Sequence, residues 1–122
     1  MDSPARRILI VDDDAGLLRV IANYLARVGY QVDTCSRAAE ACALVEANPS
    51  IYTRALVDLN MPDMRGEEVA RRILDADASI RVLVMSGYPA GTGGPAALNG
   101  RVDFLPKPFT PGELAAALAH IP

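Results

Sequence analysis

The sequence predicts a single α/β domain, spanning residues 1–122, in which five parallel strands form one doubly wound sheet. Short apolar runs alternate five times with helical stretches, which is typical of right-handed βαβ units. The runs are rich in branched aliphatic residues and show no polar alternation, so we expect strands that are buried on both faces. The 122 residues fit one domain, because domains usually contain ~100 to 200 residues.

The apolar runs give the positions of the five expected strands. They are residues 6–11, 31–35, 54–57, 81–85 and 102–105. Each run is short and is followed at once by polar, glycine or proline residues, as expected for strands that end at the edge of a buried sheet. In open parallel sheets the chemistry lies at the carboxyl ends of the strands, beside the point where the strand order reverses. The residues that follow these runs are therefore the candidates for a functional site.

Helices are expected between the strands. The first should begin after Asp14 as N-cap and stop at Gly29, with an apolar face between them. A second helix, capped by Ser36, should continue to about Ala47 and break at Pro49. A third lies around residues 69–74. These ends follow from local capping and stop signals in the sequence.

The last helix should open at Thr110 with Pro111 in its first position. A fourth helix belongs between residues 87 and 100, but this stretch contains five glycines and two prolines. Glycine costs about 1 kcal/mol and proline about 3 kcal/mol in a helix interior. We therefore expect a weak or irregular fourth helix.

Composition excludes several functions. Twelve basic against fifteen acidic side chains give a net charge of −3 and a pI near 5.0, which argues against direct binding to nucleic acid. No apolar run reaches the ~18 to 20 residues of a membrane span, and a signal-peptide pattern is absent, so we expect a cytoplasmic protein without direct membrane contact. Cys35 and Cys42 read as buried free thiols. Lys107 is the only lysine, which suggests that a compact ammonium charge is needed there.

Charged and polar residues follow four of the expected strands. Asp12 and Asp13 follow the first, Asp58 the third, Ser86 the fourth and Lys107 the fifth. Carboxylates crowded at one sheet edge repel each other by up to ~4 kcal/mol per pair at about 4 Å. A hard divalent cation with oxygen ligands would neutralise them, which favours Mg²⁺. A lone carboxylate such as Asp58 is a candidate nucleophile toward a phosphoryl group, with Lys107 and Ser86 available to its oxygens.

Four motifs in this order resemble the receiver domains of bacterial two-component response regulators. They are Val11-Asp12-Asp13-Asp14, the segment from Asp58 to Gly66, Met85-Ser86-Gly87 and the segment from Phe104 to Pro108. The resemblance covers nearly the whole chain. It implies the flavodoxin-like (βα)5 fold, with strand order 2-1-3-4-5.

The resemblance also implies a function for the acidic residues. Asp58 would accept a phosphoryl group from a histidine kinase or a histidine phosphotransfer domain. Asp12, Asp13 and the backbone carbonyl of Asn60 would hold Mg²⁺, with Asp13 as a direct ligand and Asp12 acting through water. Such a domain is a signalling module with Mg²⁺-dependent self-phosphorylation and autodephosphorylation, and not an enzyme acting on a separate substrate.

The same resemblance implies roles for the residues of the later strands. Lys107 would pair with the phosphoryl oxygens, Ser86 would donate to one of them, and Phe104 would swing inward with Ser86. Pro108 stands where the family has a cis peptide bond. The fourth helix, the fifth strand and the fifth helix would form the face that an output domain or protein reads. The motif around Ser86 and the segment 104–109 look most like receivers attached to hybrid sensor histidine kinases; the alternative is a stand-alone regulator.

Two other functions remain open. Asp12 and Asp14 after an apolar strand, with Ser86 and Lys107, also resemble the haloacid-dehalogenase phosphatases, which would make the protein a small phosphohydrolase. Those enzymes need a further acidic pair after the lysine, and Glu113 is the only carboxylate there. The second alternative is a pseudo-receiver that serves only as an interaction module, although none of the acidic pocket is missing.

Overall fold

The computed structural model describes residues 7–86 and 102–120. The strands are β1 (Arg7–Val11), β2 (Gln31–Cys35), β3 (Arg54–Asp58), β4 (Arg81–Ser86) and β5 (Val102–Pro106). The helices are α1 (Ala15–Arg27), α2 (Ala38–Ala47), α3 (Gly66–Ala76) and α4 (Pro111–His120). Each expected strand is present, within a residue or so of its predicted bounds. The weak fourth helix predicted within 87–100 lies outside the described residues, so α4 is the last helix of the chain.

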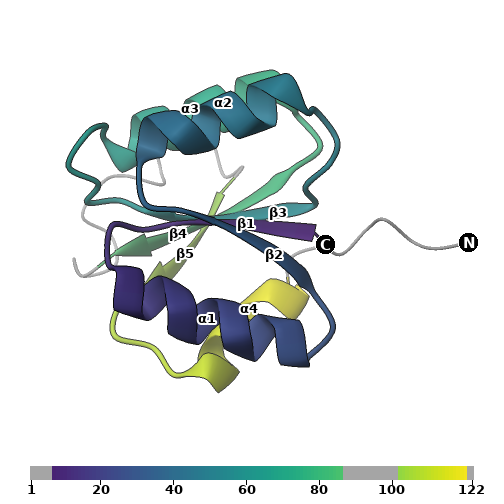
Figure 1. Cartoon of the computed structure of the whole chain (residues 1–122), viewed down its shortest axis with the longest axis vertical. Coiled ribbons are helices and arrows are strands. Elements are labelled where there is room, and N and C mark those ends of the chain that lie inside the picture. The colour runs from purple at the N-terminus through teal and green to yellow at the C-terminus, as the bar shows by residue number, and fades with distance from the viewer. Residues whose placement is uncertain (1–6, 87–101, 121–122) are drawn as a thin grey trace, which may run out of the picture.

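The strands form one parallel sheet between two layers of helices. Their order is β2-β1-β3-β4-β5, and each neighbouring pair is parallel, which confirms the predicted fold class and strand order. α2 and α3 cover one face of the sheet, while α1 and α4 cover the other (Figure 1). Among the described residues, no helix is both long and apolar enough to cross a bilayer.

The interior strand β1 shows why the apolar runs are uninterrupted. Ile8 and Ile10 pack into the cluster that includes side chains of α1 and α4, whereas Leu9 and Val11 pack into the cluster on the α2 and α3 side. All four side chains are completely buried. Full burial of such a side chain stabilises the fold by roughly 1.5–3 kcal/mol. The four positions from Ile8 to Val11 are therefore all apolar, up to the point where the strand leaves the core.

Local signals explain the ends of α1. The side chain of Asp14 accepts a hydrogen bond of 3.1 Å from the backbone N–H of Leu17, which is the predicted N-cap. Gly29 has a φ of 105°, a conformation that is open to glycine at little cost. The predicted start and stop of this helix are confirmed.

The predicted cap of α2 is wrong. Arg37 occupies the N-cap position and makes no side-chain capping bond, so Ser36 lies one residue too early to reach the free N–H groups of the first turn. The carboxylate of Asp63 accepts these hydrogen bonds instead, from Ala38 N at 3.0 Å and from Ala39 N at 3.1 Å. The cap of this helix therefore comes from a loop 25 residues further along the chain.

A reciprocal pair of hydrogen bonds closes the first turn of α4. The hydroxyl of Thr110 accepts from the backbone N–H of Glu113 at 3.0 Å, and the Glu113 carboxylate accepts from Thr110 N at 2.7 Å. This arrangement is a capping box. Thr110 and Pro111 were predicted at the start of this helix, and the glutamate three residues after the threonine is the further signal that completes the motif.

Asp77 joins two connections at the end of the sheet where the strands begin. Its carboxylate accepts from Ser50 N at 2.8 Å, from Ser79 N at 3.0 Å and from the Ser79 hydroxyl at 2.6 Å. Burial alone would raise the pKa of Asp77, but the hydrogen bonds from Ser79 and Ser50 outweigh it and lower the pKa. The ionised carboxylate therefore holds the connection between α2 and β3 against the one between α3 and β4.

We expect Asp77→Ala to lower the free energy of unfolding by about 1–3 kcal/mol, because it removes the charged acceptor of the hydrogen bonds from Ser50 and Ser79. Urea denaturation measures this loss, and Asp75→Ala, an exposed change on α3, is the control and should have little effect. The native pKa of Asp77 is lowered, so its contribution should be complete above the unfolded pKa of about 3.9 and disappear as the pH falls through the native pKa. Equal stability of the two variants at pH 7 would contradict this role.

Candidate functional site

The predicted site residues gather at the carboxyl edge of the sheet. Asp12 and Asp13 directly follow β1, and Asp58 is the last residue of the adjacent strand β3. Lys107 directly follows β5, which lies beyond β4 on the other side of β3. Because all these strands are parallel, their ends bring residues from three distant parts of the chain to one place.

Asp12, Asp13 and Asp58 form the acidic cluster. Each contributes one carboxylate oxygen, and these oxygens all lie within 4.8 Å of one another. Asp12 is completely buried and Asp58 is 4% exposed, whereas Asp13 is exposed to solvent. Two of the three charges are thus removed from water, and the third faces it.

The ammonium group of Lys107 is the cation that faces the acidic cluster. Its Nζ lies 2.8 Å from Asp12 Oδ2 and 3.6 Å from Asp58 Oδ2. The other oxygen of Asp12 accepts a hydrogen bond of 3.0 Å from Asp14 N. The peptide bond between Lys107 and Pro108 is cis, as the resemblance implies. Three carboxylates against one ammonium leave a net charge of 1 − 3 = −2 when all are ionised.

The surroundings raise the pKa values of both Asp58 and Lys107. Burial raises the pKa of Asp58, and the charges of Asp12 and Asp13 add to this, while the Asn60 N–H and Lys107 act against it. For Lys107, burial acts to lower the pKa, but the hydrogen bond and charge of Asp12, together with Asp58, raise it above the usual value. The lysine is therefore firmly held as a cation beside the carboxylates.

The acceptor loop, residues 59–65, follows Asp58 and stays close to it. Asn60 N donates to Asp58 Oδ1 at 3.1 Å, and Leu59 N donates to the carbonyl of Met85 at 2.9 Å. The loop closes where Gly66 N donates to Leu59 O. A Cβ atom on Gly66 would lie 2.4 Å from the Cα of Leu59, so only glycine permits this close approach. The backbone of Asn60 is thereby held beside the buried carboxylate.

The structure describes only part of the two residues that are predicted to move on phosphorylation, Ser86 and Phe104. Phe104 lies in β5, is half-buried and packs against the cluster on the α2 and α3 side. The backbone of Ser86 pairs with Pro106 at the end of β4, and its side chain lies outside what the structure describes. Their motion on phosphorylation stays a prediction.

The acidic cluster fits a hard divalent cation. Each of its three members offers a carboxylate oxygen within 4.8 Å of the others, and Mg²⁺ is bound in proteins by one or two carboxylates while it keeps several waters. No histidine or cysteine belongs to the cluster formed by the described residues. A soft or borderline metal such as zinc would prefer sulfur or imidazole ligands, so the donor set favours Mg²⁺.

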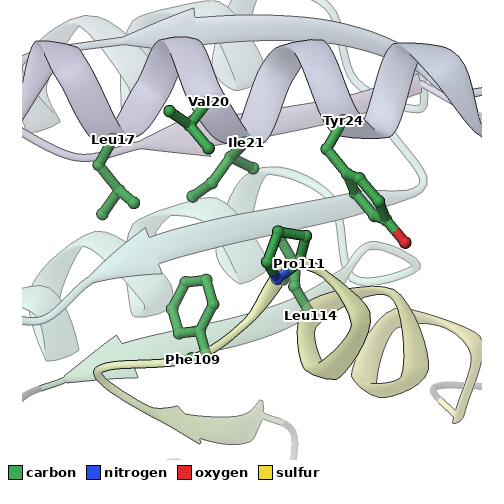
Figure 2. A pocket seen from close by; sticks show the side chains of 7 residues that line it. All are labelled: Leu17, Val20, Ile21, Tyr24, Phe109, Pro111 and Leu114. Carbon is green, nitrogen blue, oxygen red and sulfur yellow. The ribbon is translucent and has the colours of Figure 1, made fainter.

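An apolar pocket lies between α1 and α4. Figure 2 shows its side chains facing one another from the two helices and the segment before α4. It is lined by Leu17, Val20, Ile21, Tyr24, Phe109, Pro111 and Leu114. None of these side chains carries a charge. The polar chemistry of the described residues therefore belongs to the acidic cluster rather than to this pocket.

The family model of the response regulator receiver domain matches residues 8–119. The chain belongs to this family. It is accordingly a receiver domain of two-component signalling. The phosphohydrolase alternative is not favoured, and Glu113, the one carboxylate after Lys107, is bound in the capping box of α4.

Curated relatives are whole regulatory proteins. The receiver is 33% identical over 114 residues to the photosynthetic apparatus regulatory protein RegA of Cereibacter sphaeroides. The aligned region covers 93% of this chain and 61% of that protein. It is 34% identical over 118 residues to the transcriptional regulatory protein ResD of Bacillus subtilis, and the aligned region covers 88% of this chain and 44% of ResD. The chain thus spans less than two thirds of the length of these relatives.

Solved structures have the same fold. A CheY-like receiver domain protein from Methanospirillum hungatei superimposes with a TM-score of 0.85 at 30% identity, over 94% of this chain and 91% of that one. A response regulator from Burkholderia pseudomallei, described with a phosphorylated aspartic acid and a calcium ion, gives 0.82 at 26% identity, over 93% and 66%. The receiver domain of the hybrid histidine kinase CckA gives 0.79 at 28% identity, over 93% and 95%.

We expect Lys107→Met to lower the free energy of unfolding of the metal-free receiver by about 1–3 kcal/mol, because buried Asp12 loses its charged partner. Added Mg²⁺ should raise the melting temperature of this variant more than that of the wild type, since the cation supplies the missing positive charge. Lys107→Arg keeps the charge and is the control. Identical melting curves for the Met variant and the wild type without Mg²⁺ would show that the pairing with Asp12 contributes nothing.

Proposed function

We propose that Asp58 accepts a phosphoryl group from the phosphohistidine of a histidine kinase or a histidine phosphotransfer domain. One observation carries the proposal: the Asp58 carboxylate is buried at the end of a central strand, with Asn60 N on one oxygen and Lys107 Nζ 3.6 Å from the other. The Asp58 oxygen would attack phosphorus while the bond from phosphorus to the histidine nitrogen breaks, and the electron pair would return to the imidazole ring.

Lys107 supports the transfer through its charge. The phosphoryl group brings additional negative charge to a cluster that already has an excess of it. The ammonium group lies within reach of Asp58, so it can pair with the new phosphoryl oxygens as they arrive. Fixed positive charge at the place where negative charge develops is the main means by which proteins stabilise phosphoryl transfer.

Asp12, Asp13 and the backbone carbonyl of Asn60 would hold Mg²⁺. Both oxygens of Asp12 already have partners, Asp14 N and Lys107 Nζ. Asp13 is exposed, and within residues 7–86 and 102–120 no hydrogen bond to its carboxylate is found. This difference supports Asp13 as the direct ligand and Asp12 as one that acts through water. Bound Mg²⁺ would neutralise charge on the phosphoryl oxygens.

The signal would leave through the later part of the fold. Ser86 would donate to a phosphoryl oxygen, and Phe104 would move inward behind it. The half-buried position of Phe104 on β5 supports this, because the ring is neither locked in the core nor free in solvent. β5, α4 and the segment before β5 would then present a changed face to an output domain or protein.

Phosphorylation with a small donor tests the acceptor. In the presence of Mg²⁺ and acetyl phosphate, the wild type should gain the mass of one phosphoryl group, and Asp58→Asn should gain none. Asp75→Asn removes the same charge from an exposed position on α3 and should react like the wild type. If Asp58→Asn were phosphorylated at the wild-type rate, another residue would be the acceptor.

Calorimetric titration with Mg²⁺ tests the metal ligands. Asp13→Ala should lose measurable Mg²⁺ binding, yet its melting temperature without metal should stay the same or rise, because one of three repelling charges is removed. Asp14→Asn is the matched control, since it removes the neighbouring charge and keeps an N-cap oxygen. Unchanged Mg²⁺ affinity in Asp13→Ala would count against this arrangement.

A further inference from the structure

The carboxylate of Asp63 connects the acceptor loop to another element. Its two oxygens accept hydrogen bonds from Ala38 N at 3.0 Å and Ala39 N at 3.1 Å, in the first turn of α2. The N-cap residue Arg37 provides no capping bond of its own. The N–H groups of Ala39 and Ala38 lower the pKa of Asp63. One side chain of the loop therefore caps the N-terminus of a helix that begins 25 residues earlier in the chain.

The end of β2, just before α2, contacts the other side of the acidic cluster. The backbone N–H of Asp12 donates to the carbonyl of Cys35 at 3.1 Å, and Cys35 is the last residue of β2. Only two residues separate Cys35 from Ala38. Residues 35–39, which we name the brace, thus bind the Asp12 backbone at one end and the acceptor loop at the other.

The other hydrogen bonds of the acceptor loop that the structure describes do not join it to residues 35–39. The hydrogen bonds of Leu59 and Asn60 join the loop to β4 and to Asp58, at its first two residues. Met61 is anchored by burial in the core cluster. Among the described residues, the pair of bonds to Asp63 is the only hydrogen-bonded link from the loop to the side of the sheet edge where Asp12 and Asp13 lie.

We propose that Asp63 is a positioning residue for the metal site: by capping α2 it fixes the Asn60 backbone relative to Asp12 and Asp13. This inference rests on the proposed function, because it assumes that Mg²⁺ is held between the end of β1 and the acceptor loop. Asp63 itself touches neither the metal nor the phosphoryl group. Its effect is to keep two halves of one site, which the chain reaches 45 residues or more apart, at a fixed separation.

Three variants separate positioning from charge. Asp63→Ala removes both acceptor oxygens, Asp63→Asn keeps one, and Asp75→Asn removes an exposed charge that makes no described contact. We expect Asp63→Ala to raise the Mg²⁺ dissociation constant by about three- to tenfold, because loss of the N-cap frees the acceptor loop from the start of α2. Asp63→Asn should fall between this value and the wild type, because asparagine caps helices nearly as well as aspartate.

The measurements are made on the full chain, well below its melting temperature. Calorimetry gives the Mg²⁺ dissociation constant, and amide hydrogen exchange at Ala38 and Ala39 reports whether the cap is lost. Phosphorylation by acetyl phosphate is then followed against Mg²⁺ concentration. The Asp63 variants should need more Mg²⁺ but reach the wild-type rate at saturation, since the acceptor and Lys107 are unchanged.

Two results would overturn the inference. Faster exchange at Ala38 and Ala39 with wild-type Mg²⁺ affinity would make the cap a matter of helix stability alone. Equal weakening by Ala and Asn would assign the effect to the lost charge. If Asp63→Ala does not fold, the test falls to Asp63→Asn. Wild-type Mg²⁺ affinity in Asp63→Asn, together with faster exchange at Ala38, would likewise show that the cap serves helix stability alone. Failure of the wild type itself to bind Mg²⁺ or to be phosphorylated at Asp58 would instead contradict the proposed function.

Discussion

Three carboxylates lie close together at the end of the sheet, and the surrounding fold has to hold them there against their mutual repulsion. Two like charges at about 4 Å repel each other by up to ~4 kcal/mol when the effective dielectric constant is near 20. Two of these groups, Asp12 and Asp58, are buried, which adds the cost of removing them from water. Only a rigid frame can hold such an arrangement, and the doubly covered sheet provides it.

Lys107 offsets part of this repulsion, and the distances of its ammonium group show which carboxylate it mainly neutralises. Its ammonium group lies closer to Asp12 than to Asp58, so in the metal-free receiver the lysine mainly compensates the most deeply buried carboxylate. The remaining excess of negative charge is what a divalent cation would offset in the proposed metal site. A site that is destabilised alone and relieved by its ligand is a common compromise between stability and function.

The edge of the sheet brings the site residues together, but additional contacts set their separation. The backbone of Asp12 is bound to the end of β2, and the loop after Asp58 is bound to the start of α2 through Asp63. Both contacts converge on residues 35–39, which carry no residue of the acidic cluster. A segment outside the site thus takes part in its geometry, because the two sides of the site belong to different stretches of chain.

Local patterns in the sequence predicted the strands and most helix ends, and they indicated which residues gather in the acidic cluster. The branched aliphatic runs, the Asp14 cap and the Gly29 stop act over a few residues, and the motifs at the strand ends indicated Asp12, Asp13, Asp58 and Lys107. Which charges pair follows from the packing of distant segments. The contact of Lys107 with Asp12 spans 95 residues, and the cap of α2 by Asp63 spans 25. Local pattern predicted Ser36 for that cap, because it contains no information on which distant side chain the packing of the sheet brings within hydrogen-bonding distance.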